Sequence, residues 1–373
     1  MGLLFRWLVV LLSIGSNDVH YWHQFATSIG QVGLADTYRT ITIFNHPPLM
    51  GLYSALALKV SVAAEIRFAI LLKIPAILGE IITARLLYLI VLQSSKDPRT
   101  AALTFAGYAW SISAIAVSSY HGNTDCLCVA LALGAAYFVE KERFLLGGLI
   151  LAGAVNVKLI PVLLFVPYCT RAQSIRQALR FIAGFAVGLI PFVFVWLRCF
   201  PEFYRNAIAY QPNRDNWGLI LFISEGMGSA NLKPYVAEFA RFFFPWARYA
   251  ILISVTLFAI AARPRQSANA YQLGCVGFVL FLVLASGFGI QYVAYVGPFL
   301  FAVSYRRGMI YAFLSGLFVF SIYFHFWNRA FPYESVFVYK FPMFAGLVGI
   351  LPWAYLVALI PEHLKLLRRP TAT

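Results

Sequence analysis

The stretch FAILLKIPAILGEIITARLLYLIVL, residues 68–92, decides the fold class because only Lys73, Glu80 and Arg85 carry charge in it. A helix of about 20 apolar residues is long enough to cross a bilayer. In the whole chain of 373 residues, 61% are hydrophobic and 12% are charged, whereas soluble domains carry about 25% charged residues. Such a chain cannot cover itself with polar groups, so lipid is the solvent for most of it. The sequence therefore predicts an all-α integral membrane protein.

About twelve apolar runs are candidate transmembrane helices. They cover residues 1–15, 68–92, 100–118, 123–139, 144–157, 158–169, 178–198, 246–262, 270–286, 290–304, 308–324 and 342–361. The segment 47–64 is also apolar, but it starts with Pro47-Pro48 and contains Lys59. We predict that it lies in the membrane plane as an amphipathic helix of the first outer loop, 15–67.

The predicted organisation is a single polytopic membrane domain, 1–373. Residues 1–200 form a catalytic-type helical module that includes the first outer loop, 199–245 form an outer loop, and 246–373 form C-terminal helices.

The net charge of +15 is explained by topology and does not indicate nucleic-acid binding. With 47–64 in the membrane plane, six basic segments fall on one side, which the positive-inside rule makes cytoplasmic. These segments contain Lys96 and Arg99; Lys141 and Arg143; Arg171, Arg176 and Arg180; Arg263 and Arg265; Arg306 and Arg307; and Lys365, Arg368 and Arg369. Both termini are then inside, and an anionic lipid or phosphate ligand remains a second possible reason for the charge.

Unusual polar residues collect on the opposite, outer side. Asp18, Asp125 and Lys158 stand at the outer ends of apolar runs, and charged groups near a membrane usually line a cavity or a site. Glu80 and Arg85 lie about one turn apart within one span and are expected to pair with each other. An outer-face enzyme with a lipid-borne sugar would need a base, a partner for the leaving phosphate and an apolar groove, which these residues and segment 47–64 could supply.

In this arrangement the chain resembles the GT-C class of polytopic glycosyltransferases that use polyprenyl- or dolichyl-phosphate sugars. The matching motifs are GSNDVHYW (15–22), FNHPPL (44–49), IRFAILLKIPAILGEI (66–81), HGNTD (121–125), NVKLIPVLLFVPY (156–168) and QYVAYVGPFL (291–300). Each motif is short, and their order along the chain carries the resemblance.

The resemblance implies a role for each matching residue and an inverting transfer. Asp18 would be the catalytic base. The donor and its phosphate would be bound by Lys158, His46, Arg214, Gln291 and Tyr292, and the acceptor or sugar would be positioned by His121, Asn123, Asp125 and His20. The expected partners are the lipid-phosphate sugar, a lipid or glycan acceptor and membrane lipids. The expected location is a bacterial plasma membrane with the site facing outward, or the endoplasmic reticulum membrane in a eukaryote.

No cofactor is predicted. A requirement for a divalent metal is left open, because no motif in the sequence supports it. No clear Asp-x-Asp occurs, and the five cysteines have no zinc-type spacing. Two other functions remain as alternatives. A transporter or lipid flippase should show polar groups near the midplane and matching broken helices, and a non-catalytic scaffold would not need Asp18, Asp125 and Lys158 on one face.

Overall fold

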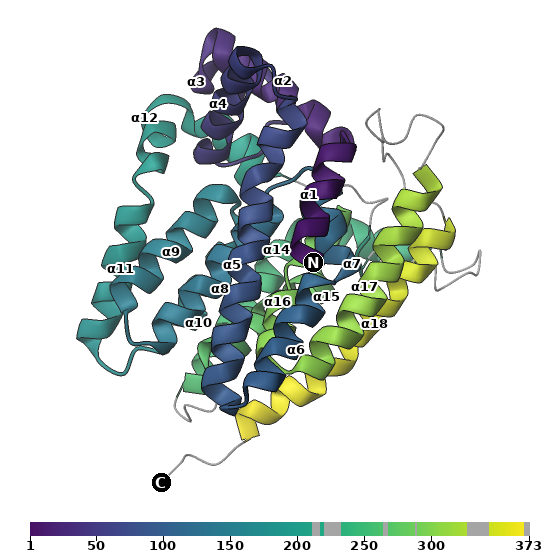
Figure 1. Cartoon of the computed structure of the whole chain (residues 1–373). Coiled ribbons are helices and arrows are strands. Elements are labelled where there is room, and N and C mark those ends of the chain that lie inside the picture. Colours follow the sequence, from purple (N-terminus) through teal and green to yellow (C-terminus); the bar gives the residue numbers. More distant parts are fainter. Residues whose placement is uncertain (211–216, 220–232, 264–267, 288, 327–342, 369–373) are drawn as a thin grey trace.

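The computed structural model describes residues 1–210, 217–219, 233–263, 268–287, 289–326 and 343–368, which form helices and no strands (Figure 1). The first half contains α1 (Gly2–Leu12), α2 (Asn17–Val32), α3 (Leu34–Thr40), α4 (Pro48–Ala64), α5 (Phe68–Ser95), α6 (Pro98–Ala109), α7 (Ile112–Ile115), the π-helix η1 (Ala116–His121), α8 (Asp125–Glu140) and α9 (Phe144–Val157). The second half contains the 3₁₀ helix η2 (Ile160–Leu164), α10 (Phe165–Cys169), α11 (Ile175–Gly188), α12 (Pro191–Phe203), the π-helix η3 (Tyr204–Ile208), α14 (Lys233–Ala262), α15 (Ala270–Leu284), the 3₁₀ helix η5 (Ile290–Ala294), α16 (Gly297–Val303), α17 (Tyr305–Phe326), α18 (Met343–Leu364) and the 3₁₀ helix η6 (Lys365–Arg368).

The all-helical class is confirmed for the described residues, whereas fewer helices than expected are long and apolar enough to be candidate spans. Within those residues, α5, α14, α17 and α18 contain the 4 helices long and apolar enough to cross a membrane, or up to 6 if each bent helix pair is one span. About twelve spans are therefore not confirmed. The runs 1–15, 144–157 and 290–304, for example, fall on helices of 10–17 residues, and an 11-residue helix such as α1 is only about 17 Å long.

Two runs that were expected to be continuous spans are bent helix pairs. The run 100–118 is bent by 49° between α6 and α7, where the Ser111 side chain caps the new helix by accepting a hydrogen bond from the Ala114 amide. The run 178–198 is bent by 62° between α11 and α12, where Pro191 starts the second helix. The expected loop 199–245 is helical at both ends, because η3 extends α12 and α14 begins at Lys233.

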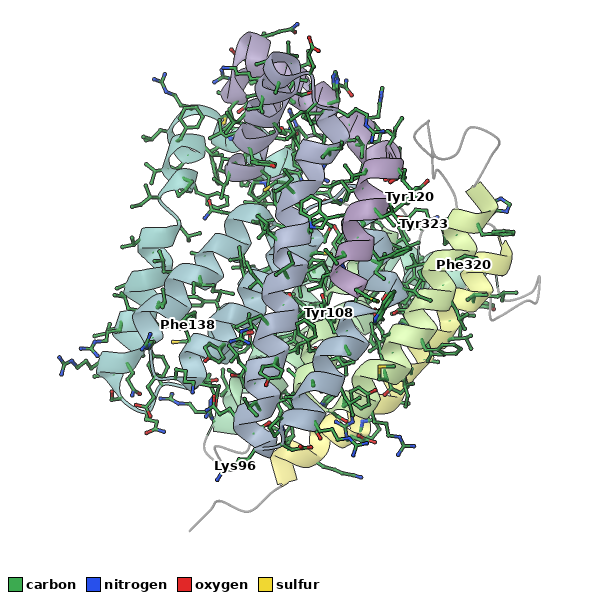
Figure 2. All side chains as sticks on the ribbon, in the orientation of Figure 1. Lys96, Tyr108, Tyr120, Phe138, Phe320 and Tyr323 are labelled. Atoms are coloured by element: carbon green, nitrogen blue, oxygen red, sulfur yellow. The ribbon has the colours of Figure 1, made fainter. Side chains whose placement is uncertain are left out.

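Helices α2, α3 and α4 gather at one end of the molecule, and α5 runs from there to Lys96 at the other end (Figures 1 and 2). The segment 47–64 is a helix as expected, with Pro47 as its N-cap and Pro48 in its first turn. Its orientation in a membrane stays a prediction. The α2–α4 end is held together by buried aromatic side chains, including Trp22, Phe25 and Tyr38.

Glu80 does not pair with Arg85, so this expectation was wrong. The Glu80 carboxylate instead lies 2.7 Å from the Arg6 guanidinium and accepts a hydrogen bond of 2.9 Å from the Tyr108 hydroxyl. A separation of five residues turns a helix by about 140°, so Arg85 points away from Glu80. Arg6, Glu80 and Tyr108 are all buried, and they join α1, α5 and α6 inside the helical bundle.

Candidate active site

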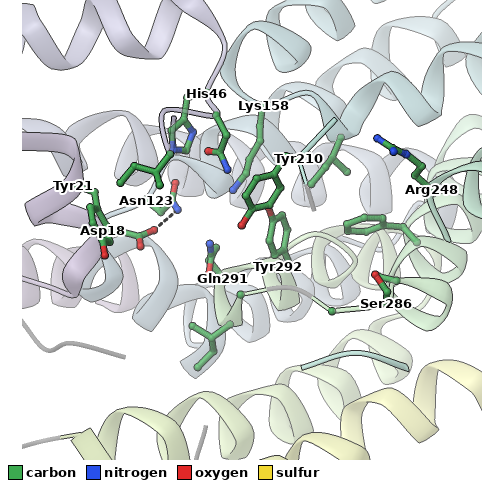
Figure 3. Close-up of a pocket in the computed structure, with 18 of the residues that line it drawn as sticks. Asp18, Tyr21, His46, Asn123, Lys158, Tyr210, Arg248, Ser286, Gln291 and Tyr292 are labelled. Atoms are coloured by element: carbon green, nitrogen blue, oxygen red, sulfur yellow. Dashed lines mark hydrogen bonds between the residues drawn. The ribbon is translucent and has the colours of Figure 1, made fainter. Parts of the chain in front are cut away.

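A cavity of about 600 Å³ lies at the α2 end of the molecule. Its wall combines the first turns of α2 with residues from the segments 43–46, 121–123, 285–287 and 289–292, and α14 closes another side. Figure 3 shows Asp18 and Tyr21 on one side of the cavity and Arg248 and Ser286 on the other. Seven residues expected in the site line this cavity, namely Asp18, His46, His121, Asn123, Lys158, Gln291 and Tyr292.

The turn after η1 places His121 and Asn123 against the start of α2. The Ser16 hydroxyl donates a hydrogen bond of 2.7 Å to the His121 carbonyl oxygen, which ties the two segments together. Gly122 makes the turn possible because its φ is +82°, and a Cβ there would lie 2.2 Å from the Val19 side chain. Only glycine therefore lets α2 and this turn approach so closely.

Asp18 is held by two side chains through one of its carboxylate oxygens. Asn123 Nδ2 donates a hydrogen bond of 2.5 Å to Asp18 Oδ2, and His121 Nε2 lies 3.1 Å from the same oxygen. The Tyr323 hydroxyl contacts His121 Nδ1 on the other side of the ring. With a proton on Nε2, the His121 ring donates a hydrogen bond to Asp18 Oδ2. Among the described residues, Asp18 Oδ1 has no hydrogen-bond partner, so it is open to a ligand.

The environment keeps Asp18 ionised. Burial by itself would raise the pKa of the Asp18 carboxyl, but His121, which also hydrogen-bonds to it, and the ammonium group of Lys158 hold this pKa below its usual value of 3.8. Asp18 also lies in the first turn of α2, where the helix dipole favours a negative charge. At neutral pH the cavity therefore presents a carboxylate that can accept a proton.

Lys158 faces the cavity, but its charge is already paired. The chain leaves α9 at Lys158, whose backbone is extended, and the ammonium group lies 2.7 and 3.0 Å from the two carboxylate oxygens of Asp125. Asp125 is 0% exposed and also accepts a hydrogen bond of 2.7 Å from the Tyr295 hydroxyl. Lys158 Nζ lies 4.4 Å from the centre of the Tyr292 ring. Asp125 thus lies behind Lys158 and does not line the cavity.

His46 is a neutral part of the wall. Its ring packs against Trp22 with the ring centres 4.3 Å apart. Burial and the nearby positive charge of Lys158 lower the pKa of His46 to about 3, although Asp18 opposes the shift. His46 Nδ1 is buried and has no hydrogen-bond partner among the described residues. This side chain can therefore donate or accept a hydrogen bond but carries no charge at neutral pH.

Arg248 is a cavity residue that the sequence reasoning missed. It lies on α14 and its guanidinium donates a hydrogen bond of 3.0 Å to the Ile208 carbonyl oxygen. Within the described ranges, no carboxylate pairs with it. An arginine inside an apolar helix was the signal that could have revealed it, because charged residues within membrane helices are usually functional. Tyr323 and Tyr295 were missed as well, and no local pattern distinguishes them from other buried tyrosines.

The family model described as Glycosyltransferase family 87 matches residues 44–287, which is more than half of the chain. The chain belongs to glycosyltransferase family 87. This membership confirms the expected resemblance to GT-C glycosyltransferases and indicates glycosyltransferase activity. No curated protein matches the chain. The matched segment of this family 87 chain includes His46, the 121–125 turn, Lys158 and Arg248, whereas Asp18 and Gln291 lie outside it.

Besides Asp125, one described residue that was expected in the site of the glycosyltransferase does not line the cavity. His20 is exposed on α2, while Asp18, Tyr21 and Trp22 of the same helix line the cavity. Arg214 lies outside the described residues. Over the part of the chain that the structure describes, no group of three His, Cys, Asp or Glu residues could hold a metal ion.

Proposed function

We propose that this glycosyltransferase transfers a sugar from a polyprenyl-phosphate or dolichyl-phosphate donor to an acceptor hydroxyl at the non-cytoplasmic face of the membrane, with Asp18 as the catalytic base. The observation that carries the proposal is the ionised Asp18 carboxylate, which is fixed through Oδ2 and open at Oδ1. On the other side of the same cavity lies the guanidinium of Arg248 (Figure 3).

The reaction begins at Asp18 Oδ1. The acceptor hydroxyl gives its proton to this oxygen as its own oxygen attacks the anomeric carbon of the donor sugar. His121 and Asn123 keep Oδ2 occupied, which orients Oδ1 towards the cavity. The Tyr323 hydroxyl keeps the imidazole of His121 in place.

The bond between the anomeric carbon and the phosphate oxygen breaks as the new bond forms. The leaving lipid phosphate takes the bonding electrons, and Arg248 stabilises its charge together with the partly compensated Lys158. Asp18 is the only acidic residue among the described residues that line the cavity. A covalent glycosyl intermediate would require a second carboxylate as nucleophile. A single displacement with inversion is therefore the mechanism that this wall supports.

The apolar part of the cavity wall is suited to a lipid-borne donor. Phe244, Ala247 and Ile251 of α14 line it, and α14 contains a candidate membrane span. The basic turns predict that the end of the molecule with Lys96 faces the cytoplasm. Helix α2, whose first turns line the cavity, lies at the opposite end (Figures 1 and 2). The sugar would therefore be transferred on the outer side of a bacterial plasma membrane, or on the lumenal side of the endoplasmic reticulum in a eukaryote.

The test is a transfer assay with the purified protein. Radiolabelled polyprenyl-phosphate sugars and, in parallel, the corresponding nucleotide sugars are incubated with a lipid and glycan extract, and the products are separated by chromatography. We expect product from one lipid-phosphate donor and a fall in kcat of about 10²- to 10⁴-fold for Asp18→Asn, which removes the base. Asp36→Asn, on exposed Asp36 of α3, is the matched control and should retain activity.

Two results would contradict the proposal. Consumption of nucleotide sugars in place of every lipid-phosphate donor would exclude the proposed donor class. An Asp18→Asn protein with the same kcat as the parent would exclude Asp18 as the base.

A further inference from the structure

A second cavity of about 320 Å³ lies between α14, α15 and the end of α18. It shares no lining residue with the active-site cavity. Val276 and Val279 of α15 form its floor, and Leu257 and Leu364 are exposed at its sides on α14 and α18. Both of these side helices contain candidate membrane spans, so the gap between them faces hydrocarbon if they cross the bilayer. A hydrocarbon chain is the natural filling for such a gap, because water there would lack hydrogen-bond partners.

Two polar side chains, Ser254 and His363, stand in this otherwise apolar wall. His363, in the last turn of α18, is 5% exposed and lines the cavity. Its Nε2 atom is buried and has no hydrogen-bond partner among the described residues. Buried polar groups in proteins are nearly always hydrogen-bonded. The occupant of the cavity should therefore carry a polar atom beside an otherwise apolar chain.

Two cations stand at the same end of the cavity. Arg263 directly follows α14 and Lys365 directly follows α18, and both are exposed. The two helix ends lie close together, because Leu366 packs in one small apolar cluster with Phe258 and Ala262. Within the described segments, neither cation forms an ion pair. Basic residues near a membrane surface attract anionic lipid headgroups.

We propose that this cavity binds one anionic phospholipid from the leaflet at the basic end of the molecule. One acyl chain fills the gap between α14 and α18 over α15. An ester carbonyl oxygen of the lipid accepts a hydrogen bond from His363 Nε2, and the phosphate lies between Arg263 and Lys365. Along α18 and the residue after it, the apolar Ile360, His363 and Lys365 follow one another in the order of chain, ester and phosphate in a phospholipid.

The affinity test uses the full chain in detergent, titrated with phosphatidylglycerol or with phosphatidylcholine and measured by native mass spectrometry. Each basic residue near the membrane surface raises the affinity for an anionic lipid about fivefold. The double variant Arg263→Gln/Lys365→Gln should therefore weaken phosphatidylglycerol binding about 30-fold. Phosphatidylcholine binding should not change. Arg176→Gln/Arg180→Gln on α11 removes the same charge elsewhere and is the matched control. His363→Leu should weaken both lipids and keep the preference for phosphatidylglycerol.

The site itself is located with a phosphatidylglycerol that carries a diazirine on one acyl chain, in nanodiscs of phosphatidylcholine. Crosslinks in the parent protein should concentrate on Leu257, Leu280 and their neighbours in the cavity wall. Equal affinity for the two lipids, an effect of the double variant no larger than that of the control, or crosslinks spread over all the lipid-facing helices would overturn the proposal. The crosslinking arm needs no variant, so a variant that fails to fold does not weaken the test.

Discussion

Replacing Lys158 by methionine should destabilise the protein more than most single substitutions do. The change removes the cation from an ion pair with two short contacts, 2.7 and 3.0 Å, and leaves the Asp125 carboxylate fully buried. Only the Tyr295 hydroxyl would still donate a hydrogen bond to this carboxylate among the described residues. Breaking a buried ion pair in this way typically costs about 3–5 kcal/mol, because one charge stays uncompensated.

The double variant Lys158→Met/Asp125→Asn distinguishes the effect of losing the whole ion pair from the effect of leaving one buried charge uncompensated. It removes both charges, and replacing a whole buried pair is often close to neutral in stability. With an unfolding entropy of about 2.1 cal/mol/K per residue, a loss of 3–5 kcal/mol lowers the apparent Tm of a chain this long by about 4–6 °C. We therefore expect Lys158→Met to melt several degrees below the parent, and the double variant to recover most of that loss.

Thermal unfolding in detergent and transfer kinetics are measured on the same preparations. If Lys158 mainly positions Tyr292 and Asp125, the recovered double variant should keep a KM for the donor close to that of the parent. If Lys158 instead binds the donor phosphate directly, the recovered protein should show a KM about tenfold or more higher. Equal stability of the single variant and the parent would refute the view that Asp125 depends on Lys158 for its charge balance.

Three further outcomes are expected. Arg248→Gln should raise the KM for the donor about 10- to 100-fold through the loss of a charge-assisted hydrogen bond, and Arg248→Lys should restore part of it, as measured by initial rates. Gly122→Ala should lower activity and Tm together, because its φ of +82° and its closeness to Val19 leave no room for a Cβ, and activity and melting assays on one sample check this. Acid should destabilise the protein through His46. The pKa of His46 is about 3 in the folded protein and about 6.5 in the unfolded chain, so the unfolded chain binds a proton first as the pH falls below about 6.5. The free energy of unfolding should thus be unaffected by His46 above that pH and should be lower by as much as about 3 kcal/mol at pH 4. In His46→Phe, which keeps a ring beside Trp22, Tm should fall less over this range.

The helices that could be predicted from the sequence were those marked by a local pattern, such as an apolar run or a pair of prolines. The apolar runs 68–92, 246–262 and 308–324 and the described part of the run 342–361 all lie on long helices, and the Pro47-Pro48 step starts a helix as expected. The break between the runs 144–157 and 158–169 also falls at Lys158, where α9 ends. The patterns did not predict where a helix breaks inside an apolar run. The run 100–118, for example, is broken and bent at Ser111.

Pairing partners were harder to predict than helices. Glu80 has Arg85 close in sequence, yet its partner is Arg6, which lies 74 residues away in the chain. Tyr323 reaches His121 from 202 residues further along. Neither contact has a signal in sequence spacing, since both depend on which faces of separate helices meet. Asp18, which lines the cavity, could in contrast be singled out from the sequence, because an acidic residue directly after an apolar run is unusual near a membrane.

Lys158 shows how such an unseen contact changes the chemistry of a site. A lysine at a helix break is a good phosphate partner by residue type and position, but Asp125 offsets its charge from 33 residues away. The cavity wall then keeps, among its described residues, the carboxylate of Asp18 on one side and the guanidinium of Arg248 on the other. The displacement that we propose needs this separation, because the attacking oxygen would lose its proton on the side opposite the departing phosphate. Arg248, which lies within an apolar helix, is therefore a better partner for the leaving phosphate of the proposed reaction than Lys158 at the helix break.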